Sequence, residues 1–511
     1  MLKPLALALT LFAASSPLLA RQQDKPPEPS AKSKSSKERS GDLATTQHHA
    51  TINGQPLHYS ATAGYIELPD YDGKPKANVF FVSYIKDDVT DTSTRPVMFC
   101  FNGGPGSSSV WLHLGCIGPR RVDFADPAEQ PGQPAIPAPP YTIVNNEYSW
   151  LDLADLVFID PVGTGYSRPV EGEAARQFHG LNEDIQWVGD FIRLWTTQNK
   201  RWNSPKYLSG ESYGTTRAAG LSGYLQDTHG MYLSGIVMVS SVLNFQTVRF
   251  DESNDTPYWL YLPTYAATAW YHRKLEPELQ ADLQKTLREV ERFAATDYLL
   301  ALARGDALSD RERDDLAARV ARYTGLSKDF VLGSRLRINI QQFCKELLRD
   351  RSRTVGRLDS RYTGIDRNDT GSSPEFDPSY AAIQGPFTAA LNHYIRTELN
   401  YENDRPYEIL TGRVQPWSYA SAQNRYASVA ETLRQAMSKN AHLRVLFASG
   451  YYDLATPYFA TDYTITHLGL DPALKGNVSH VYYESGHMMY IRHADLVKLK
   501  ADVAAFMKPK R

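Results

Sequence analysis

YLSGESYGTTRAAG, residues 207–220, places a serine between two glycines where a strand pattern gives way to a helix pattern. The apolar residues before Gly210 predict a buried strand, and the residues after Ser212 have helical spacing. In that context a G-x-S-x-G motif predicts a sharp turn that lifts the serine hydroxyl out of the sheet. Because glycines and serines also meet in ordinary loops, the motif alone makes Ser212 only a candidate nucleophile.

Short apolar and β-branched runs recur along the chain, and several are almost continuously apolar, which is typical of parallel strands buried on both faces. Helical periodicity fills the intervals. The sequence therefore predicts an α/β fold with a mostly parallel central sheet and helices on both faces. Residues 55–68 and 77–88 alternate as antiparallel strands do, so the sheet should begin with a hairpin. The buried runs are PVMFCF (96–101), ADLVFID (154–160), KYLSG (206–210), SGIVMVSS (234–241), LRVLFASG (443–450) and HVYYESG (480–486).

The N-terminus has the pattern of a secretory signal peptide over residues 1–20, because Lys3 precedes an apolar stretch and Ala20 offers a small residue for cleavage. A membrane anchor would need about 20 consecutive apolar residues, and Ser15 interrupts this stretch. Residues 21–45 are polar and charged, and we expect a disordered linker there. The protein is therefore expected to be exported, either periplasmic or secreted, without stable membrane insertion.

The alternation of strands and helices is interrupted in the middle of the chain. Residues 245–440 carry helical patterns followed by an irregular stretch rich in Tyr, Asn, Asp and Gly. We interpret this segment as an inserted, mostly helical cap. The core is then expected to consist of residues 46–244 and 441–511.

Composition excludes several classes of protein. The 511 residues are 42% hydrophobic and 22% charged, which is enough for a substantial core. The formal net charge of −2 gives no field of one sign that would attract nucleic acid or an anionic membrane. The three cysteines, Cys100, Cys116 and Cys344, leave at least one without a partner in the chain, so the fold does not depend on a disulfide framework. Nothing in the composition indicates the oligomeric state.

A serine at such a turn needs partners in the chain order Ser, then Asp or Glu, then His. Asp453 follows one predicted strand and His487 follows the next. In this chemistry the imidazole takes the serine proton, while the carboxylate fixes the imidazole tautomer and stabilises its charged form. His480 and His493 are alternatives, but they fall within a strand pattern and on the last helix. The spacing of these histidines matches no metal-binding motif, so we expect neither a metal nor an organic cofactor.

A glycine-rich loop follows the first buried strand in FCFNGGPGSSSVW, residues 99–111. An acyl-transfer site needs N–H groups that hold the negative oxygen of the tetrahedral intermediate, each contributing about 3 kcal/mol. The N–H groups of Gly104 and Tyr213 are the predicted oxyanion hole. The alternative interpretation of the loop is a plain tight turn.

Five motifs together resemble, in order and spacing, those of the serine carboxypeptidases: NGGPGSSS (102–109), DPVGTGYS (160–167), GESYG (210–214), SGYYDLATP (449–457) and ESGHMM (484–489). The resemblance extends from about residue 60 to the end. It implies an α/β-hydrolase fold with a cap, a peptide substrate and a catalytic triad of Ser212, Asp453 and His487. It also implies an oxyanion hole at Gly104 and Tyr213.

In that family the asparagine and first glycine of N-G-G, with the glutamate before the serine, bind the C-terminal carboxylate of the substrate. The resemblance therefore implies this role for Asn102, Gly103 and Glu211. Two positions depart from the family pattern. Ser107 stands where the family usually has a disulfide-bonded cysteine, and Cys116 stands where members tend to carry a second glutamate.

The resemblance implies an exported serine carboxypeptidase that acts through an acyl-enzyme intermediate. An esterase or acyltransferase on the same triad is the first alternative, because Cys116 removes one carboxyl group from the carboxylate-binding network. A noncatalytic binding relative is the second, since a fold does not guarantee an activity. To bind a carboxylate, Glu211 must be protonated, so activity should favour acidic conditions. Unless burial alone raises its pKa enough, binding should fade at a lower pH than in members with two glutamates.

Overall fold

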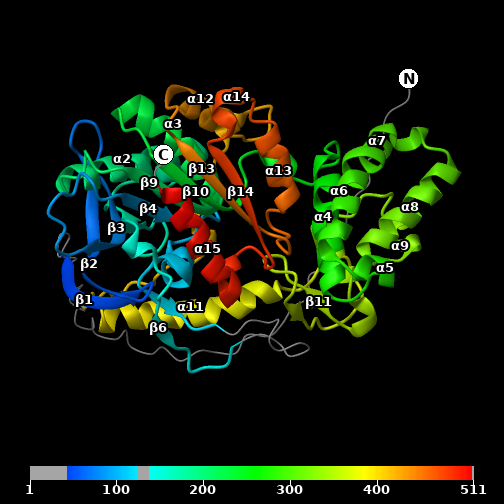
Figure 1. Ribbon diagram of the computed structural model, residues 1–511, viewed down its shortest axis with the longest axis horizontal. Helices are drawn as coiled ribbons and strands as arrows, with labels where there is room; N and C mark the ends of the chain where they lie inside the picture. Colours follow the sequence, from blue (N-terminus) through cyan, green and yellow to red (C-terminus); the bar gives the residue numbers. More distant parts are fainter. Residues whose placement is uncertain (1–42, 125–136, 509–511) are drawn as a thin grey trace, which may run out of the picture. The chain divides into compact units, whose positions relative to one another are not determined.

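One large sheet organises the computed structural model, which describes residues 43–124 and 137–508 (Figure 1). Six neighbouring strands of the sheet run parallel, namely β7, β4, β9, β10, β13 and β14, whereas β1, β2 and β3 are antiparallel to their neighbours. The predicted parallel sheet with an antiparallel beginning is confirmed. In spatial order the strands are β1 (Ala44–Ile52), β2 (Gln55–Pro69), β3 (Pro75–Lys86), β7 (Asp155–Ile159), β4 (Val97–Phe101), β9 (Lys206–Ser212), β10 (Gly235–Ser241), β13 (Arg444–Gly450) and β14 (Val478–Tyr483), and β8 (Arg168–Pro169) pairs with β3.

The predicted signal peptide, residues 1–20, lies outside the described residues, as does most of the predicted linker. The structure differs from the expected linker boundary at its last residues. Ala44 and Thr45 belong to β1, where they pair with Ala63 and Thr62 of β2. Pairing with β2 gives the backbone groups of these two residues hydrogen-bond partners that their local composition does not predict.

Helices cover both faces of the sheet, as the alternation of patterns predicts. On one face lie α2 (Leu181–Gln198), α3 (Tyr213–His229) and α12 (Ala430–Lys439), and on the other lie α11 (Pro378–Thr397) and α15 (His493–Met507) (Figure 1). In β4, Val97, Phe99 and Phe101 pack with the first group of helices, while Met98 and Cys100 pack with the second. Because successive side chains of a strand point to opposite faces, burial on both sides makes the run continuously apolar.

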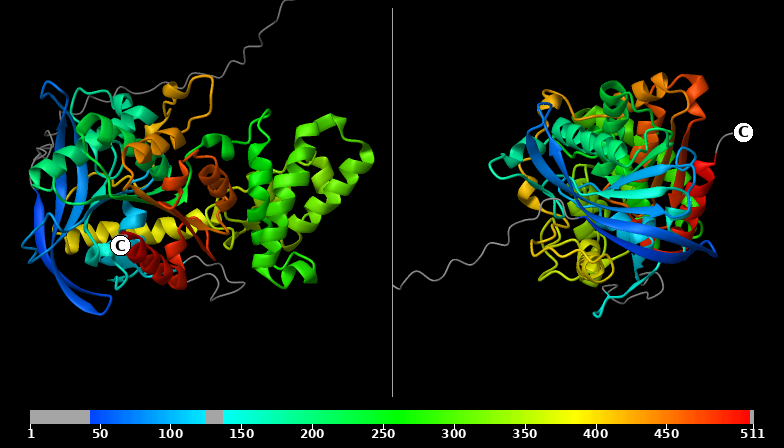
Figure 2. Two further views of the ribbon diagram at one scale, coloured as in Figure 1. Left: turned by 45° about the horizontal axis from the view of Figure 1, so that its top comes forward. Right: turned by 90° about the vertical axis from the view of Figure 1, so that its left-hand side faces the viewer.

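The middle of the chain divides between two kinds of packing. The helices between residues 256 and 346 bury their apolar sides in a hydrophobic cluster that they share with Tyr452, Leu454 and Tyr458, and they form a separate green group in Figure 2. In contrast, Phe387 and Leu391 of α11 and Leu433 of α12 pack against the sheet. A helical pattern shows which side of a helix is apolar but not which element it will face. The helices of the separate group are α4 (Thr256–Tyr271), α5 (Pro277–Gln280), α6 (Leu283–Phe293), α7 (Leu299–Arg304), α8 (Asp310–Thr324), α9 (Lys328–Gly333) and α10 (Ile340–Glu346).

Short elements complete the described chain. Two small antiparallel pairs lie outside the large sheet, and α13 and α14 connect β13 to β14. These short elements include β5 (Arg120–Val122) with β6 (Ile143–Asn145), β11 (Thr354–Val355) with β12 (Thr363–Gly364), α1 (Val110–Leu112), the π-helical turn η1 (His113–Ile117), α13 (Tyr458–Thr466), α14 (Pro472–Lys475) and the 3-10 turn η11 (Met489–Ile491).

The candidate nucleophile lies at the turn between β9 and α3. Ser212 has a φ of 59°, a strained value for a residue with a side chain. A Cβ at Gly210 would lie 2.3 Å from the carbonyl oxygen of Gly214, and one at Gly214 would lie 2.9 Å from that of Phe101. The turn therefore has no room for side chains on either side of Glu211, Ser212 and Tyr213, which explains the two glycines of the motif.

Gly210→Ala should lower the free energy of unfolding by about 2–3 kcal/mol, because the added methyl group meets backbone that cannot rotate away. Gly333 is the matched control, since a Cβ there meets nothing within 4 Å. Gly333→Ala should change the free energy of unfolding by less than about 1 kcal/mol. Urea denaturation of the two variants measures the difference, and equally small effects would contradict the close approach at the elbow.

Candidate functional site

Asp453 and His487 form a buried pair on the loops that follow the neighbouring strands β13 and β14. The Nδ1–H of His487 donates to Oδ2 of Asp453 at 2.8 Å. The carboxylate also accepts the N–H groups of Ala455 and Thr456 at 2.8 and 3.0 Å and the Thr456 hydroxyl at 2.7 Å. With both oxygens bonded, the carboxylate has one fixed orientation, and it holds the imidazole in the tautomer whose Nε2 is free to accept a proton.

The pKa of His487 reflects opposing effects. Burial disfavours the charged imidazolium, but the charge of Asp453 and its hydrogen bond, with a further contribution from the charge of Glu211, raise the pKa of His487 above its usual value. The positive charge of Arg357 acts in the opposite direction. The imidazole is therefore a stronger base than a free histidine, as proton abstraction from a serine requires.

A segment that follows the separate helical group holds both of these loops. The N–H of His487 donates to the carbonyl oxygen of Leu358 at 2.7 Å, and the N–H of Leu454 donates to that of Arg357 at 3.0 Å. On its other side the carbonyl oxygen of His487 accepts the Ser240 hydroxyl at 2.7 Å. The backbone of the histidine is thus fixed from the middle segment and from the sheet at once.

The two alternative histidines lie elsewhere. His480, on β14, interacts through Nδ1 with Asp462 at 2.8 Å and through Nε2 with the Ser449 hydroxyl at 3.0 Å. His493 begins α15, and its ring lies edge-on to that of Tyr148. Within the described residues no group of three or more His, Cys, Asp or Glu side chains is arranged to hold a metal ion.

Ser212 and His487 line the same cavity, whose volume is about 300 Å³. Its apolar walls include Trp111, Tyr380 and Leu410. This volume is at the lower end of the range for small-molecule sites, so the cavity accommodates part of a larger substrate rather than the whole of it. The structure therefore brings the candidate nucleophile and the candidate base to one opening.

The glycine-rich loop after β4 lies directly against the elbow. A Cβ at Gly103 would be 2.4 Å from the backbone nitrogen of Tyr213, so only glycine permits this approach. Gly104 follows with a φ of 103°, a conformation that favours glycine. The loop and the first turn of α3 thus meet backbone to backbone, with Gly103, Gly104 and Ser212 all lining the cavity. This junction is where the sequence predicts the oxyanion hole, with N–H groups from Gly104 and Tyr213.

A buried arginine holds this loop in place. The Nη1–H of Arg217, on α3, donates to the carbonyl oxygen of Asn102 at 2.6 Å, and its Nε–H donates to Asp184 at 2.7 Å. The N–H of Leu112 donates to the side-chain oxygen of Asn102 at 3.1 Å. Since the two groups of a trans peptide point in opposite directions, the N–H of Gly103 points away from Arg217.

Ser107, the residue in place of the usual cysteine, is buried and hydrogen-bonded. Its hydroxyl donates to the carbonyl oxygen of Ile409 at 3.2 Å and accepts the indole N–H of Trp111 at 2.8 Å. Backbone bonds from Ser108 to Ile409 and from Thr411 to Gly106 join the same two segments. Hydrogen bonds therefore tie the glycine-rich loop to residues 409–411, and all three cysteines of the chain are free and buried.

Glu211, the residue before the nucleophile, lines the cavity but is almost fully buried, and both of its carboxyl oxygens are hydrogen-bonded. The side-chain amide of Asn102 donates to Oε1 at 3.0 Å, and the hydroxyl of Tyr490 donates to Oε2 at 2.6 Å. Burial raises the pKa of Glu211 to about 7, against the opposing effects of His487, Tyr490 and Asn102. Below that pH the side chain is neutral and has a proton to donate.

Several of these supports have no clear signal in the sequence. Arg217 reads as a charged residue on an ordinary helix, yet its side chain is fully buried. Tyr490 lies three residues beyond His487, just outside the recognised motif, and a tyrosine there matches no pattern of catalytic residues. Leu358 acts through its backbone carbonyl, which any residue provides.

Comparisons with known proteins show which family the chain is similar to. A family model described as serine carboxypeptidase matches residues 52–505. The chain is 26% identical over 214 residues to serine carboxypeptidase-like 45 of Arabidopsis thaliana, covering 40% of this chain and 41% of that protein. It is 32% identical over 154 residues to the pheromone-processing carboxypeptidase KEX1 of Colletotrichum graminicola, covering 30% of this chain and 21% of that protein. These matches thus span less than half the length of either relative.

A solved structure is similar over most of the chain. The prohormone-processing carboxypeptidase Kex1 of Saccharomyces cerevisiae superposes with a TM-score of 0.54, covering 88% of this chain and 91% of that one. At 16% identity this similarity shows a shared α/β-hydrolase fold. In the part of the chain that the structure describes, no helix is both long enough and apolar enough to cross a bilayer.

Labelling of the protein by a fluorophosphonate should speed up as the pH rises through a midpoint above the usual histidine value of about 6.5, because His487 must be neutral to take the serine proton. Asp453→Asn should slow labelling and move the midpoint to lower pH, since the negative charge that raises the pKa of His487 is lost. His480→Gln is the control, because His480 pairs with a different carboxylate. A midpoint unchanged by Asp453→Asn would place the base elsewhere.

Proposed function

Because this chain belongs to the serine carboxypeptidase family, we propose that it is a serine carboxypeptidase that removes residues one at a time from the C-termini of peptides. Its N-terminal pattern, residues 1–20, supports export to the periplasm or the exterior. The observation that carries the proposal is the position of Glu211, a buried carboxyl group beside the nucleophile in the same cavity. Catalysis alone does not need this group, whereas recognition of a terminal carboxylate does.

The reaction uses the triad in two steps. The Oγ of Ser212 attacks the carbonyl carbon of the last peptide bond while His487 takes the hydroxyl proton, and Asp453 stabilises the resulting imidazolium. The N–H groups of Gly104 and Tyr213 bind the oxyanion. His487 then gives its proton to the departing amine, so the C-terminal amino acid leaves and the rest of the peptide stays as an ester of Ser212. Water, activated by the same histidine, hydrolyses that ester.

The terminal carboxylate is bound by Asn102, Gly103 and Glu211. Neutral Glu211 donates a hydrogen bond to the carboxylate, whereas ionised Glu211 repels it. Burial raises the pKa of Glu211 to about 7, so the neutral form persists through the acidic range without the second carboxyl group that relatives tend to have. The substitution at Cys116 therefore need not abolish carboxylate binding.

Glu211 and His487 make opposite demands on the pH. His487 must lose its proton to act as a base, while Glu211 must keep its proton to act as a donor. The charge of each shifts the pKa of the other, so the pair titrates as a unit. Hydrolysis of a free-acid peptide should therefore pass through a maximum with pH, limited by His487 on the acidic side and by Glu211 on the basic side.

An esterase or acyltransferase is the second candidate function. Cys116 in place of a second carboxyl group favours it, because the network for a terminal carboxylate then has one group fewer. The triad and oxyanion hole would be the same. Only the role of Glu211 differs between the two functions, so an experiment on Glu211 separates them.

Two substrates that differ only at the C-terminus, a free carboxylate and a carboxamide, test the proposal. We expect kcat/KM for the free acid to fall as the pH rises through about 7, whereas kcat/KM for the amide should rise as His487 loses its proton and should not fall afterwards. Glu211→Gln should flatten the fall, since glutamine donates at any pH. Equal pH dependence of the two substrates, unaffected by Glu211→Gln, would overturn the carboxypeptidase proposal in favour of the esterase or acyltransferase.

A further inference from the structure

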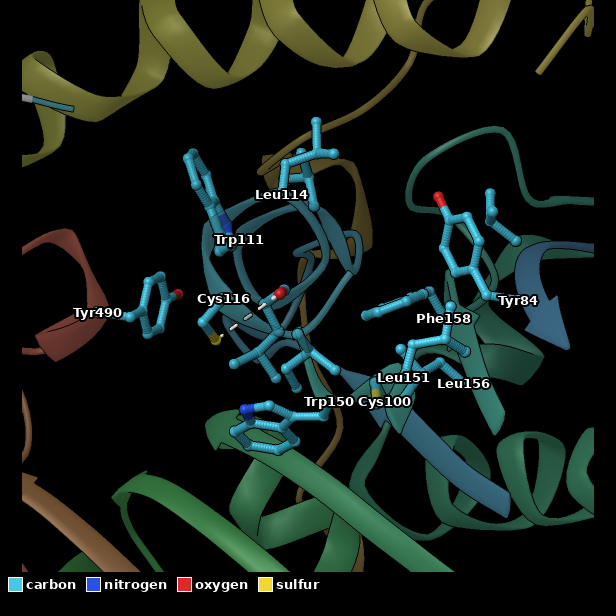
Figure 3. Packing of buried hydrophobic residues seen from close by; sticks show 14 of the residues in the cluster. Tyr84, Cys100, Trp111, Leu114, Cys116, Trp150, Leu151, Leu156, Phe158 and Tyr490 are labelled. Carbon is cyan, nitrogen blue, oxygen red and sulfur yellow. Dashed lines mark hydrogen bonds between the residues drawn. The ribbon is translucent and has the colours of Figure 1, made fainter. Parts of the chain in front are cut away.

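Cys116 occupies the position expected for a second glutamate, but it does not interact with Glu211 by a hydrogen bond. The thiol is fully buried in η1, and its Sγ–H points to the carbonyl oxygen of Leu112 at 3.8 Å, the dashed line in Figure 3. Burial raises the pKa of this thiol, so it stays neutral. Cys116 therefore supplies neither a negative charge nor a proton to Glu211.

Tyr490 reaches Glu211 from another part of the chain instead. It belongs to η11, and Figure 3 shows its ring entering from the side, with the hydroxyl directed toward Cys116. The hydroxyl donates to Oε2 of Glu211 at 2.6 Å, and the side chain is buried. A Cβ at Gly115 would lie 2.3 Å from Cε2 of this ring. The small residues at 115 and 116 thus provide the space that the tyrosine fills.

The hydrogen bonds around Glu211 leave one direction open. Asn102 donates to Oε1, which acts as the carbonyl oxygen when the side chain is neutral. The protonated Oε2 can accept the Tyr490 hydroxyl and still donate its own proton, because a hydroxyl oxygen is both donor and acceptor. Glu211 also lines the cavity beside Ser212. With its two protein donors fixed, the remaining O–H is available to a ligand there.

We propose that Tyr490 is a positioning residue for the C-terminal carboxylate of the substrate: it holds Oε2 of Glu211 so that the neutral glutamate donates its proton into the cavity. The hydroxyl takes the structural place of a second carboxyl group. The inference rests on the proposed function, since it assigns Tyr490 a role in recognising that carboxylate.

A tyrosine in this place has a different consequence from a carboxyl group. Its hydroxyl remains a donor across the working pH range, because burial and the charge of Glu211 raise the pKa of Tyr490 well above the usual value. A permanent donor favours the ionised form of Glu211, while burial favours the neutral form. The other titratable groups that act on Glu211 are His487 and Asp453, with Cys116 facing it as a neutral thiol. Tyr490 therefore fixes the orientation of Glu211 and lowers its pKa.

Tyr490→Phe removes the hydroxyl and keeps the ring that fills the space above Gly115. Measured below pH 6, KM for the free-acid peptide should rise about tenfold relative to KM for the matched amide, the effect of one hydrogen bond that orients a binding group. The fall of kcat/KM with rising pH should move to higher pH, because ionised Glu211 has lost a donor. At high pH the higher KM lowers kcat/KM for the free acid, whereas the proton that Glu211 retains raises it. A general loss of structure would not produce this pair of opposite effects.

Tyr323→Phe is the matched control. Tyr323 is also buried and donates to a glutamate, Glu289, at 2.8 Å, but within the separate helical group. It should change neither the free-acid preference nor the pH midpoint. In Glu211→Gln the further change Tyr490→Phe should no longer shift the pH profile, because the group through which Tyr490 acts no longer titrates.

Equal changes for the free-acid and amide peptides in Tyr490→Phe, with an unmoved midpoint, would overturn the role of Tyr490. A shift of the pH profile by Tyr490→Phe that persists in the Glu211→Gln background would also overturn this role. A wild-type profile in which Glu211 does not titrate, so that Glu211→Gln leaves it unchanged, would also overturn the role of Tyr490, whether or not Tyr490→Phe folds. A wild-type enzyme that does not prefer the free acid would instead contradict the proposed function itself.

Discussion

The contact between the backbone of the glycine-rich loop after β4 and the backbone of the elbow is the constraint on which the rest of the site depends. A Cβ at Gly103 would overlap the backbone nitrogen of Tyr213. A Cβ at Gly210 or Gly214 would likewise be too close to backbone carbonyl oxygens around the elbow. This contact brings the oxyanion donors, the nucleophile and Glu211 to one cavity. Arg217 stabilises this contact, because one guanidinium binds both the carbonyl oxygen of Asn102 in the loop and the carboxylate of Asp184. Side chains at these glycines would force the loop and the elbow apart.

Two buried ionisable groups around that contact have their pKa values raised by different means. The pKa of His487 rises because the charge and hydrogen bond of Asp453 outweigh burial, whereas the pKa of Glu211 rises because burial outweighs its donors. A base and an acid can therefore coexist near neutral pH within one small site. The loops of Asp453 and His487 are both bonded to residues 357–358, which follow the separate helical group.

The sequence predicts the sheet well because strands buried on both faces are continuously apolar, as in β4, and because glycine spacing marks the elbow at Ser212. Ser212, Asp453 and His487 each follow a predicted strand, in the chain order that the triad requires. The structure pairs Asp453 with His487 as expected. Three features could not be predicted. The packing of α11 against the sheet depends on which apolar surface it meets, and the burial of Arg217 depends on partners distant in sequence. The bond from Tyr490 to Glu211 depends on the space left by Gly115, which no local pattern encodes.

Mass spectrometry of the acid-quenched enzyme, mixed briefly with a peptide that has a free C-terminal carboxylate, tests the central claim most directly. The account predicts an ester on Ser212 that adds the mass of the peptide shortened by its last residue, less one water, as attack on the last peptide bond and departure of one amino acid require. Ser212→Ala should give no adduct. An adduct on another residue, or one that corresponds to cleavage inside the peptide, would contradict the account.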